Sequence, residues 1–115
     1  MKILKKRVLR GPNYWSNWRH NLILMRIDLE EMEHCPSNTI PGFPERMERL
    51  LSSLHEHRYS RGYEGGFLER LKEGTWMGHV MEHVALELQI LAGMECGFGR
   101  TQTDVPAGLY NVIFN

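Results

Sequence analysis

The sequence predicts a single α+β domain in which a small mixed sheet is packed by two or three helices. Its length of 115 residues suits one domain. The hydrophobic period changes along the chain from strand-like to helix-like and back. Hydrophobic residues make up 42% and charged residues 24%, which is ordinary for a globular chain and excludes disordered and low-complexity classes.

Three segments predict the strands of the sheet. Residues 2–9 mix Ile, Leu and Val with Lys and Arg, which indicates a strand with one solvated side. Residues 21–29 begin as a continuous apolar run and then alternate apolar with charged residues, which is typical of a central strand. The apolar residues 108–114 predict the last strand.

An amphipathic helix is predicted over residues 43–56, because apolar residues recur there at helical spacing. His55 and His57 close this segment. Histidines two apart do not share a helical face, so the pair is a poor metal site. Favourable charge at the helix C-terminus explains them better.

Two further helices are predicted before the last strand. Residues 67–72 form a short helix, and residues 75–92 form a longer one that Thr75 caps at its N-terminus. We expect one apolar stripe to anchor the longer helix in the core, formed by Met77, Val80, Val84, Leu88 and Leu91.

Charge and cysteine usage restrict the partners and the compartment. The chain has 14 basic and 14 acidic residues, whereas a general nucleic-acid binder carries a basic excess. Cys35 and Cys96 lie far apart and make no zinc-finger spacing, so we expect free thiols and a cytoplasmic protein. No apolar run approaches the ~20 residues that cross a membrane. Neither nucleic acid nor membrane is an expected partner.

The longer helix contains an HxxEH pattern formed by His79, Glu82 and His83. At about 100° per residue, the two histidines lie on one face of the helix and can share one metal ion. Glu82 lies only about 60° from His79 on the same helical wheel. It can therefore reach a metal-bound water without being a ligand.

Glu87 lies one further turn along that face. As a third ligand it would complete a His₂Glu zinc site with an open position for water. Zn²⁺ makes such a water acidic, and Glu82 would accept its proton and pass it to the leaving amine. The alternative is a helix whose histidines and glutamates form only hydrogen bonds or ion pairs. Both interpretations stay open at this point.

Residues 97–101 read as a glycine-rich loop, and residues 10–15 as a turn. The chain has no P-loop pattern. Arg100 is a candidate to hold a substrate carboxylate in a forked pair, and the alternative is a plain turn with a solvated arginine.

These motifs, in this order, resemble the N-terminal domain of cyanophycin synthetases. The resemblance covers essentially the whole chain. It is carried by residues 9–16, 36–38, 40–43, 65–68, 73–79, 82–89, 91–94 and 97–101.

The resemblance implies that the full-length enzymes join aspartate and arginine into cyanophycin, a storage polymer with a poly-aspartate backbone. The ATP-grasp and Mur-ligase-like domains that do so, with ATP and Mg²⁺, are expected to be absent from residues 1–115. It further implies that the N-terminal domain holds the polymer. In some members its HxxEH helix is associated with metal-dependent cleavage of the polymer to short primers.

Two functions therefore remain open for this chain. The first is a polymer-binding domain with a metallopeptidase-type site, in which His79, His83 and Glu87 hold Zn²⁺ and Glu82 moves the proton. The second is a non-catalytic module for binding and assembly, whose HxxEH helix is structural. The expected partners are the cyanophycin polymer and the other domains of the synthetase.

Overall fold

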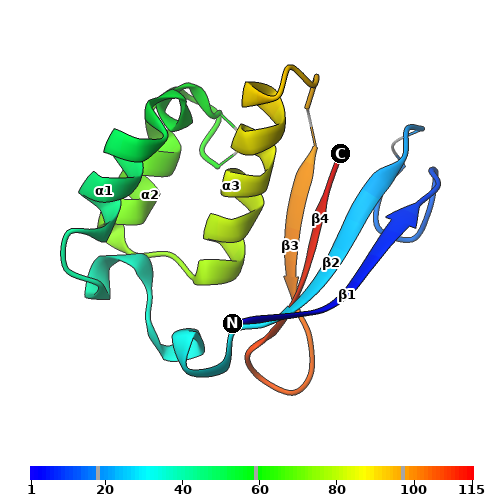
Figure 1. Ribbon diagram of the computed structural model, residues 1–115, viewed down its shortest axis with the longest axis horizontal. Helices are drawn as coiled ribbons and strands as arrows, with labels where there is room; N and C mark the ends of the chain where they lie inside the picture. The colour runs from blue at the N-terminus through cyan, green and yellow to red at the C-terminus, as the bar shows by residue number, and fades with distance from the viewer. Residues whose placement is uncertain (18, 59, 97) are drawn as a thin grey trace.

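A computed structural model describes residues 1–17, 19–58, 60–96 and 98–115. In these residues the chain forms a sheet with a helical layer on one side of it, which confirms the α+β class (Figure 1). The strands and α-helices are β1 (Lys2–Leu9), β2 (Leu22–Asp28), α1 (Phe43–Leu50), α2 (Gly66–Glu73), α3 (Met77–Leu91), β3 (Gly99–Thr103) and β4 (Leu109–Phe114).

The sheet has the strand order β1-β2-β4-β3, and every neighbouring pair is antiparallel. The expected mixed sheet is therefore wrong in this detail. β1 with β2 and β3 with β4 are hairpins, whose strands must be antiparallel. The central pair is also antiparallel, with Ile23 opposite Phe114, so no parallel pair arises.

β3 lies where a glycine-rich loop was expected. Gly99 begins this strand, and Gly97 lies outside the described residues. A Cβ atom on Gly99 would meet Glu82 Oε1 at 2.7 Å and Leu86 Cδ1 at 2.8 Å. The glycine thus marks a close approach of the strand to α3 rather than a turn, which the local sequence does not distinguish.

The main core lies between the sheet and the helices. Ile27, Phe67, Leu86 and Val112 are all fully buried in it. Alternate residues of β2 and β4 point to the opposite face of the sheet. There they form a second small cluster, in which Leu22, Leu24 and Ile113 pack with Leu9, Trp15 and Phe98. Both faces of the two central strands are therefore covered.

Two helix boundaries differ from the prediction, namely the end of α1 and the start of α3. The helix expected over 43–56 ends at Leu50 and continues as a 3₁₀ turn, Ser52–Glu56. Thr75 does not cap α3, because its hydroxyl is engaged with His79 instead. The segment before α3 is held by Ser37, whose buried hydroxyl donates to the carbonyl of Leu71 and accepts from the Thr75 N–H.

α3 does not bury the apolar stripe expected for it. Met77 and Val80 are buried, but Leu88 and Leu91 are 55% and 61% exposed. The helix buries the face that bears its polar residues, as described below. This is energetically acceptable because the sheet and the 3₁₀ turn supply hydrogen-bond partners for those residues. Among the described residues, no helix has the length and apolar character needed to cross a bilayer.

Candidate functional site

A chain of hydrogen bonds runs through the buried face of α3. His79 Nε2 lies 3.1 Å from His83 Nε2, and His83 Nδ1 lies 3.1 Å from His57 Nδ1. His57 Nε2 lies 2.7 Å from Glu87 Oε2, and Ser53 donates to the other oxygen of that carboxylate. Residues of α3 are thereby joined in one network with Ser53 of the 3₁₀ turn and with His57, which directly follows that turn.

All these contacts can be hydrogen bonds when each imidazole carries a single ring proton and the donors and acceptors are arranged as follows. His57 donates from Nε2 to the Glu87 carboxylate, so its Nδ1 accepts from His83. His83 Nε2 then accepts from His79 Nε2, and the Thr75 hydroxyl, 3.0 Å away, donates to His79 Nδ1. The network is therefore complete with protein groups alone.

Burial keeps the two histidines of α3 uncharged. It lowers the pKa of His79 to about 4, with a smaller contribution from the positive charge of Arg70. It lowers the pKa of His83 to about 2, and the neighbouring His79, His57 and Arg70 add to this effect. The ring of Phe67 stacks on His83, with centroids 3.8 Å apart. Near neutral pH both imidazoles are neutral and can act as ligands.

The two histidines have the spacing of two of the ligands of a zinc ion. Two nitrogens held at ~2.1 Å from one ion lie about 3–4 Å apart, and His79 Nε2 and His83 Nε2 have this separation. A cation between them needs only a change in the ring proton of His79, whose Nδ1 would then donate to Thr75.

Glu87 joins the histidine network through His57, which lies between it and His83. Its carboxylate is 1% exposed and is bound by His57 and Ser53. Within the described ranges, no three His, Cys, Asp or Glu side chains are grouped as a metal site. The role of Glu87 as a third ligand thus stays a prediction.

Glu82 lies on another side of α3 and faces the sheet. Its Oε2 accepts a hydrogen bond from the hydroxyl of Thr101 on β3. Burial raises the pKa of the Glu82 carboxyl, and the hydrogen bond from Thr101 offsets part of that rise. Glu82 and Glu87, five positions apart on one helix, therefore have separate surroundings.

Glu82 and His79 open onto the same cavity, whose volume is about 350 Å³. Arg70 and Arg100 also line it. Arg100, on the edge strand β3, is largely exposed and donates to the carbonyl of Trp15 at 3.1 Å. The structure thus brings together the predicted acid–base residue, one predicted ligand and the predicted carboxylate-binding arginine.

His57 was not expected in this site. Its position predicted a favourable charge at a helix C-terminus, but the side chain is 3% exposed and contacts His83 and Glu87. That expectation is wrong because α1 ends earlier and the 3₁₀ turn directs residue 57 toward α3. No local spacing connects residues 57 and 83, so only the tertiary structure reveals the contact.

Comparison with known proteins gives the same family as the motifs. The model of the cyanophycin synthase-like N-terminal domain matches residues 24–115. Curated cyanophycin synthetases from Geminocystis herdmanii and Synechocystis sp. are each 60% identical to this chain over 114 residues. The one from Trichormus variabilis is 58% identical over 113 residues.

These matches cover nearly all of the chain but only a small part of each relative. The alignments with the Geminocystis and Synechocystis proteins include 99% of this chain and 13% of the relative's length. Identity at this level over almost the whole chain leaves no doubt about descent: the chain belongs to the family of cyanophycin synthase-like N-terminal domains.

Proposed function

We propose that this chain holds the cyanophycin polymer for a cyanophycin synthetase and cleaves it to short primers at the HxxEH helix. One observation carries the proposal. His79 and Glu82, a candidate ligand and a candidate acid–base group, line one cavity together with the two arginines Arg70 and Arg100.

The chemistry of the polymer suits this cavity. The family resemblance implies a substrate with an aspartate backbone and an arginine on each side-chain carboxylate. Each repeating unit therefore offers a carboxylate and a guanidinium group. Arg100 and Arg70 can each form charge-assisted hydrogen bonds with a substrate carboxylate at the rim of the cavity.

The residues on α3 have two proposed roles in peptide cleavage, which are proton transfer and metal binding. Glu82 is a suitable general base and acid, because burial raises the pKa of its carboxyl above the ordinary value and so favours the uptake of a proton. Thr101 fixes the orientation of that carboxylate. His79 and His83 would hold Zn²⁺, with Glu87 as the proposed third ligand. When bound, zinc increases the acidity of water and polarises a peptide carbonyl.

Support for the histidines as ligands comes from the groups behind them. His83 contacts His57, and His57 contacts Glu87, so the ring orientation of His83 is fixed by buried partners. Ligand histidines in metal sites are commonly oriented through their second ring nitrogen in this way. Such a preorganised pair suits metal binding.

The proposal places polymer synthesis outside this chain. The related synthetases are far longer than the aligned segment. We propose that ATP- and Mg²⁺-dependent ligation belongs to the other domains of such a protein, in ATP-grasp and Mur-ligase-like units, and that residues 1–115 form one domain that works beside them.

A second function has its own support. The hydrogen-bond network from Thr75 to Ser53 is complete without a metal ion, as a purely structural helix would require. In that case the chain is a non-catalytic module that binds the polymer and assembles with the other domains.

Zinc content and cleavage separate the two functions. The purified chain is assayed for bound metal after incubation with Zn²⁺ and dialysis, and is then incubated with cyanophycin while short products are measured. About one zinc ion per chain together with release of primers supports the enzyme. Polymer binding with neither zinc nor products supports the binding module.

A further inference from the structure

The side of α3 that points away from the histidine network is apolar. At about 100° per residue, all positions that follow the first turn on this side lie within an arc of about 120°. They form a set of hydrocarbon and thioether side chains, namely Met81, Val84, Ala85, Leu88, Leu91 and Ala92. We call these six residues the apolar face of α3.

The C-terminal half of the apolar face is exposed. Leu88 and Leu91 are 55% and 61% exposed, and Ala92 is exposed beside them. Met81, Val84 and Ala85 are partly buried and pack against the main core. A single exposed leucine is ordinary, but a row of them with no charged residue in the same arc is typical of an interaction site.

The hydrogen-bond network explains why the chain itself leaves this face uncovered. A surface helix normally turns its apolar side to the core and its polar side to water. In α3 the polar residues His83 and Glu87 point inward and are bound through His57. A rotation that buried Leu88 and Leu91 would break those hydrogen bonds. A cover for the apolar face must therefore come from outside this domain.

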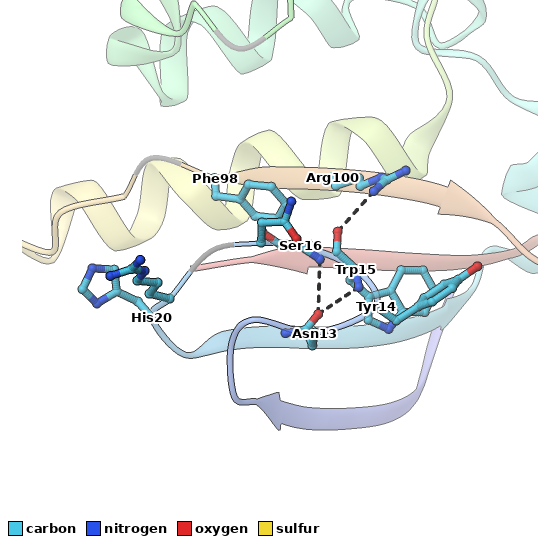
Figure 2. A pocket seen from close by; sticks show the side chains of 9 residues that line it. Asn13, Tyr14, Trp15, Ser16, His20, Phe98 and Arg100 are labelled. Atoms are coloured by element: carbon cyan, nitrogen blue, oxygen red, sulfur yellow. Dashed lines mark hydrogen bonds between the residues drawn. The ribbon is translucent and has the colours of Figure 1, made fainter.

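Two kinds of occupant do not suit the apolar face. Helices that bind at a lipid surface carry Lys and Arg beside their apolar residues, whereas residues 77–94 contain neither. A ligand of the open cavity of about 730 Å³ would not cover the face either. That cavity is lined by Tyr14, Trp15 and Arg100 and lies on the other face of the sheet (Figure 2).

The extent of the exposed surface favours a partner in the same polypeptide. Leu88, Leu91 and Ala92 present far less area than the ~800 Å² per partner that a stable pair of separate proteins buries. A covalently linked partner needs less area, because the link raises its effective concentration to the millimolar range. The synthetases that match this chain extend far beyond the aligned segment, which is 13% of their length.

We propose that the apolar face of α3 is a docking surface, which packs against a complementary apolar surface on another domain of a cyanophycin synthetase. Docking there would hold the HxxEH helix against that domain while the histidine network stays inside. The proposal rests on the part of the proposed function in which residues 1–115 work beside other domains. It does not depend on zinc, on polymer binding or on cleavage.

Photo-cross-linking in a complete synthetase tests the docking surface. This chain replaces the aligned segment of the Synechocystis synthetase, and the photoreactive residue p-benzoylphenylalanine stands in place of Ala92. After irradiation, mass spectrometry identifies the peptide joined to position 92. We expect a peptide from outside residues 1–115. The same photoreactive residue in place of the exposed Arg49 on α1 is the control and should give no such product.

Leucine substitutions separate docking from folding. The double variant Leu88→Gln, Leu91→Gln should lose the cross-link from position 92. Leu50→Gln, at the end of α1, is the matched control and should keep it, because Leu50 is 68% exposed and lies outside the apolar face. In the isolated chain each single variant should unfold within about 3 °C of the parent, as is usual for exposed positions.

Every outcome decides for or against the docking surface. A cross-link to another domain that the double variant loses and Leu50→Gln keeps supports it. No cross-link outside residues 1–115, or one that persists in the double variant, overturns it. A cross-link to residues 1–115 of a second copy also overturns it, since the occupant would then be this chain itself. Zinc content and primer release are measured on the isolated chain, so the proposed function fails or stands separately.

Discussion

Polar side chains are buried on one face of the sheet and exposed on the other. On the face covered by helices, His83 and Glu87 are 0% and 1% exposed and lie within a continuous hydrogen-bond network. On the other face, Arg19 and Arg100 remain exposed beside an open cavity. The buried groups are bonded to one another within the protein, whereas the exposed ones border solvent, and Arg100 donates to the backbone carbonyl of Trp15.

This difference sets the size of the effect that a substitution should have. Leaving one buried polar group without its partner costs about 1–3 kcal/mol. An exposed ion pair contributes about 0–1 kcal/mol and is screened by salt. Removing a member of the buried histidine network should therefore change stability and zinc binding together, whereas substitutions at exposed positions of the other face should change stability little.

The largest effect is expected for His83→Ala. The substitution removes the ring stacked on Phe67 and the contacts with His79 and His57. We expect unfolding to be easier by about 2–4 kcal/mol, and zinc and cleavage to be lost. Chemical denaturation and a zinc assay measure this. His34→Ala, on the exposed surface, is the control. An unchanged stability would show that the buried network contributes little.

Glu82→Gln should separate proton transfer from ligation. The glutamine keeps the shape of the side chain, so zinc binding and polymer binding should remain nearly intact. Cleavage should slow by about 10²–10⁴, the range for a positioned acid–base group. Primer release and zinc content are measured for the variant and for Glu95→Gln, which is exposed beyond α3. Equal cleavage by Glu82→Gln and the parent would exclude this mechanism.

Ser37→Ala tests a buried hydrogen bond of the helical layer that lies outside the histidine network. The change leaves the Thr75 N–H and the Leu71 carbonyl without their partner. We expect a loss of about 1–3 kcal/mol in the free energy of unfolding. Ser52→Ala, at an exposed position, should have little effect. Equal stabilities of the two variants would mean that the Ser37 bonds are replaced by water.

Gly99→Ala tests the close approach of β3 to α3. The added methyl group would meet the Glu82 carboxylate and Leu86 within 3 Å. We expect a loss of about 1–2 kcal/mol from overpacking, together with slower cleavage because Glu82 is displaced. Thr103→Ala, at an exposed position of the same strand, is the control for denaturation and cleavage. A fully active Gly99→Ala variant would show that the position of Glu82 is not critical.

The smallest effect is expected on β1. Val8 is 67% exposed and belongs to β1, an edge strand of the sheet that the helices do not cover (Figure 1). Val8→Thr should change the free energy of unfolding by less than about 0.5 kcal/mol and leave the binding of cyanophycin unchanged. Chemical denaturation and a cyanophycin-binding assay check this. A larger loss of stability would mean that this exposed position on β1 contributes to the stability of the fold.

The sequence by itself determined the elements whose signal is local. Strands β1, β2 and β4 and helices α2 and α3 occur where the hydrophobic period predicts them, although β1 is exposed on both sides and not on one as expected. The same reasoning brings His79 and His83 together, since residues four apart on a helix are neighbours. The family also follows from the sequence, through motifs that extend along almost the whole chain.

Only the tertiary structure decided which groups meet these residues. His57, Ser53 and Thr101 contact α3 from segments that are distant in sequence. The burial of the polar face of α3, in place of Leu88 and Leu91, depends on those partners. Gly99 reads as a loop residue until α3 is seen to pack against it. Short-range sequence patterns do not specify such contacts, because the packing between helices and strands depends on the tertiary arrangement of the whole chain.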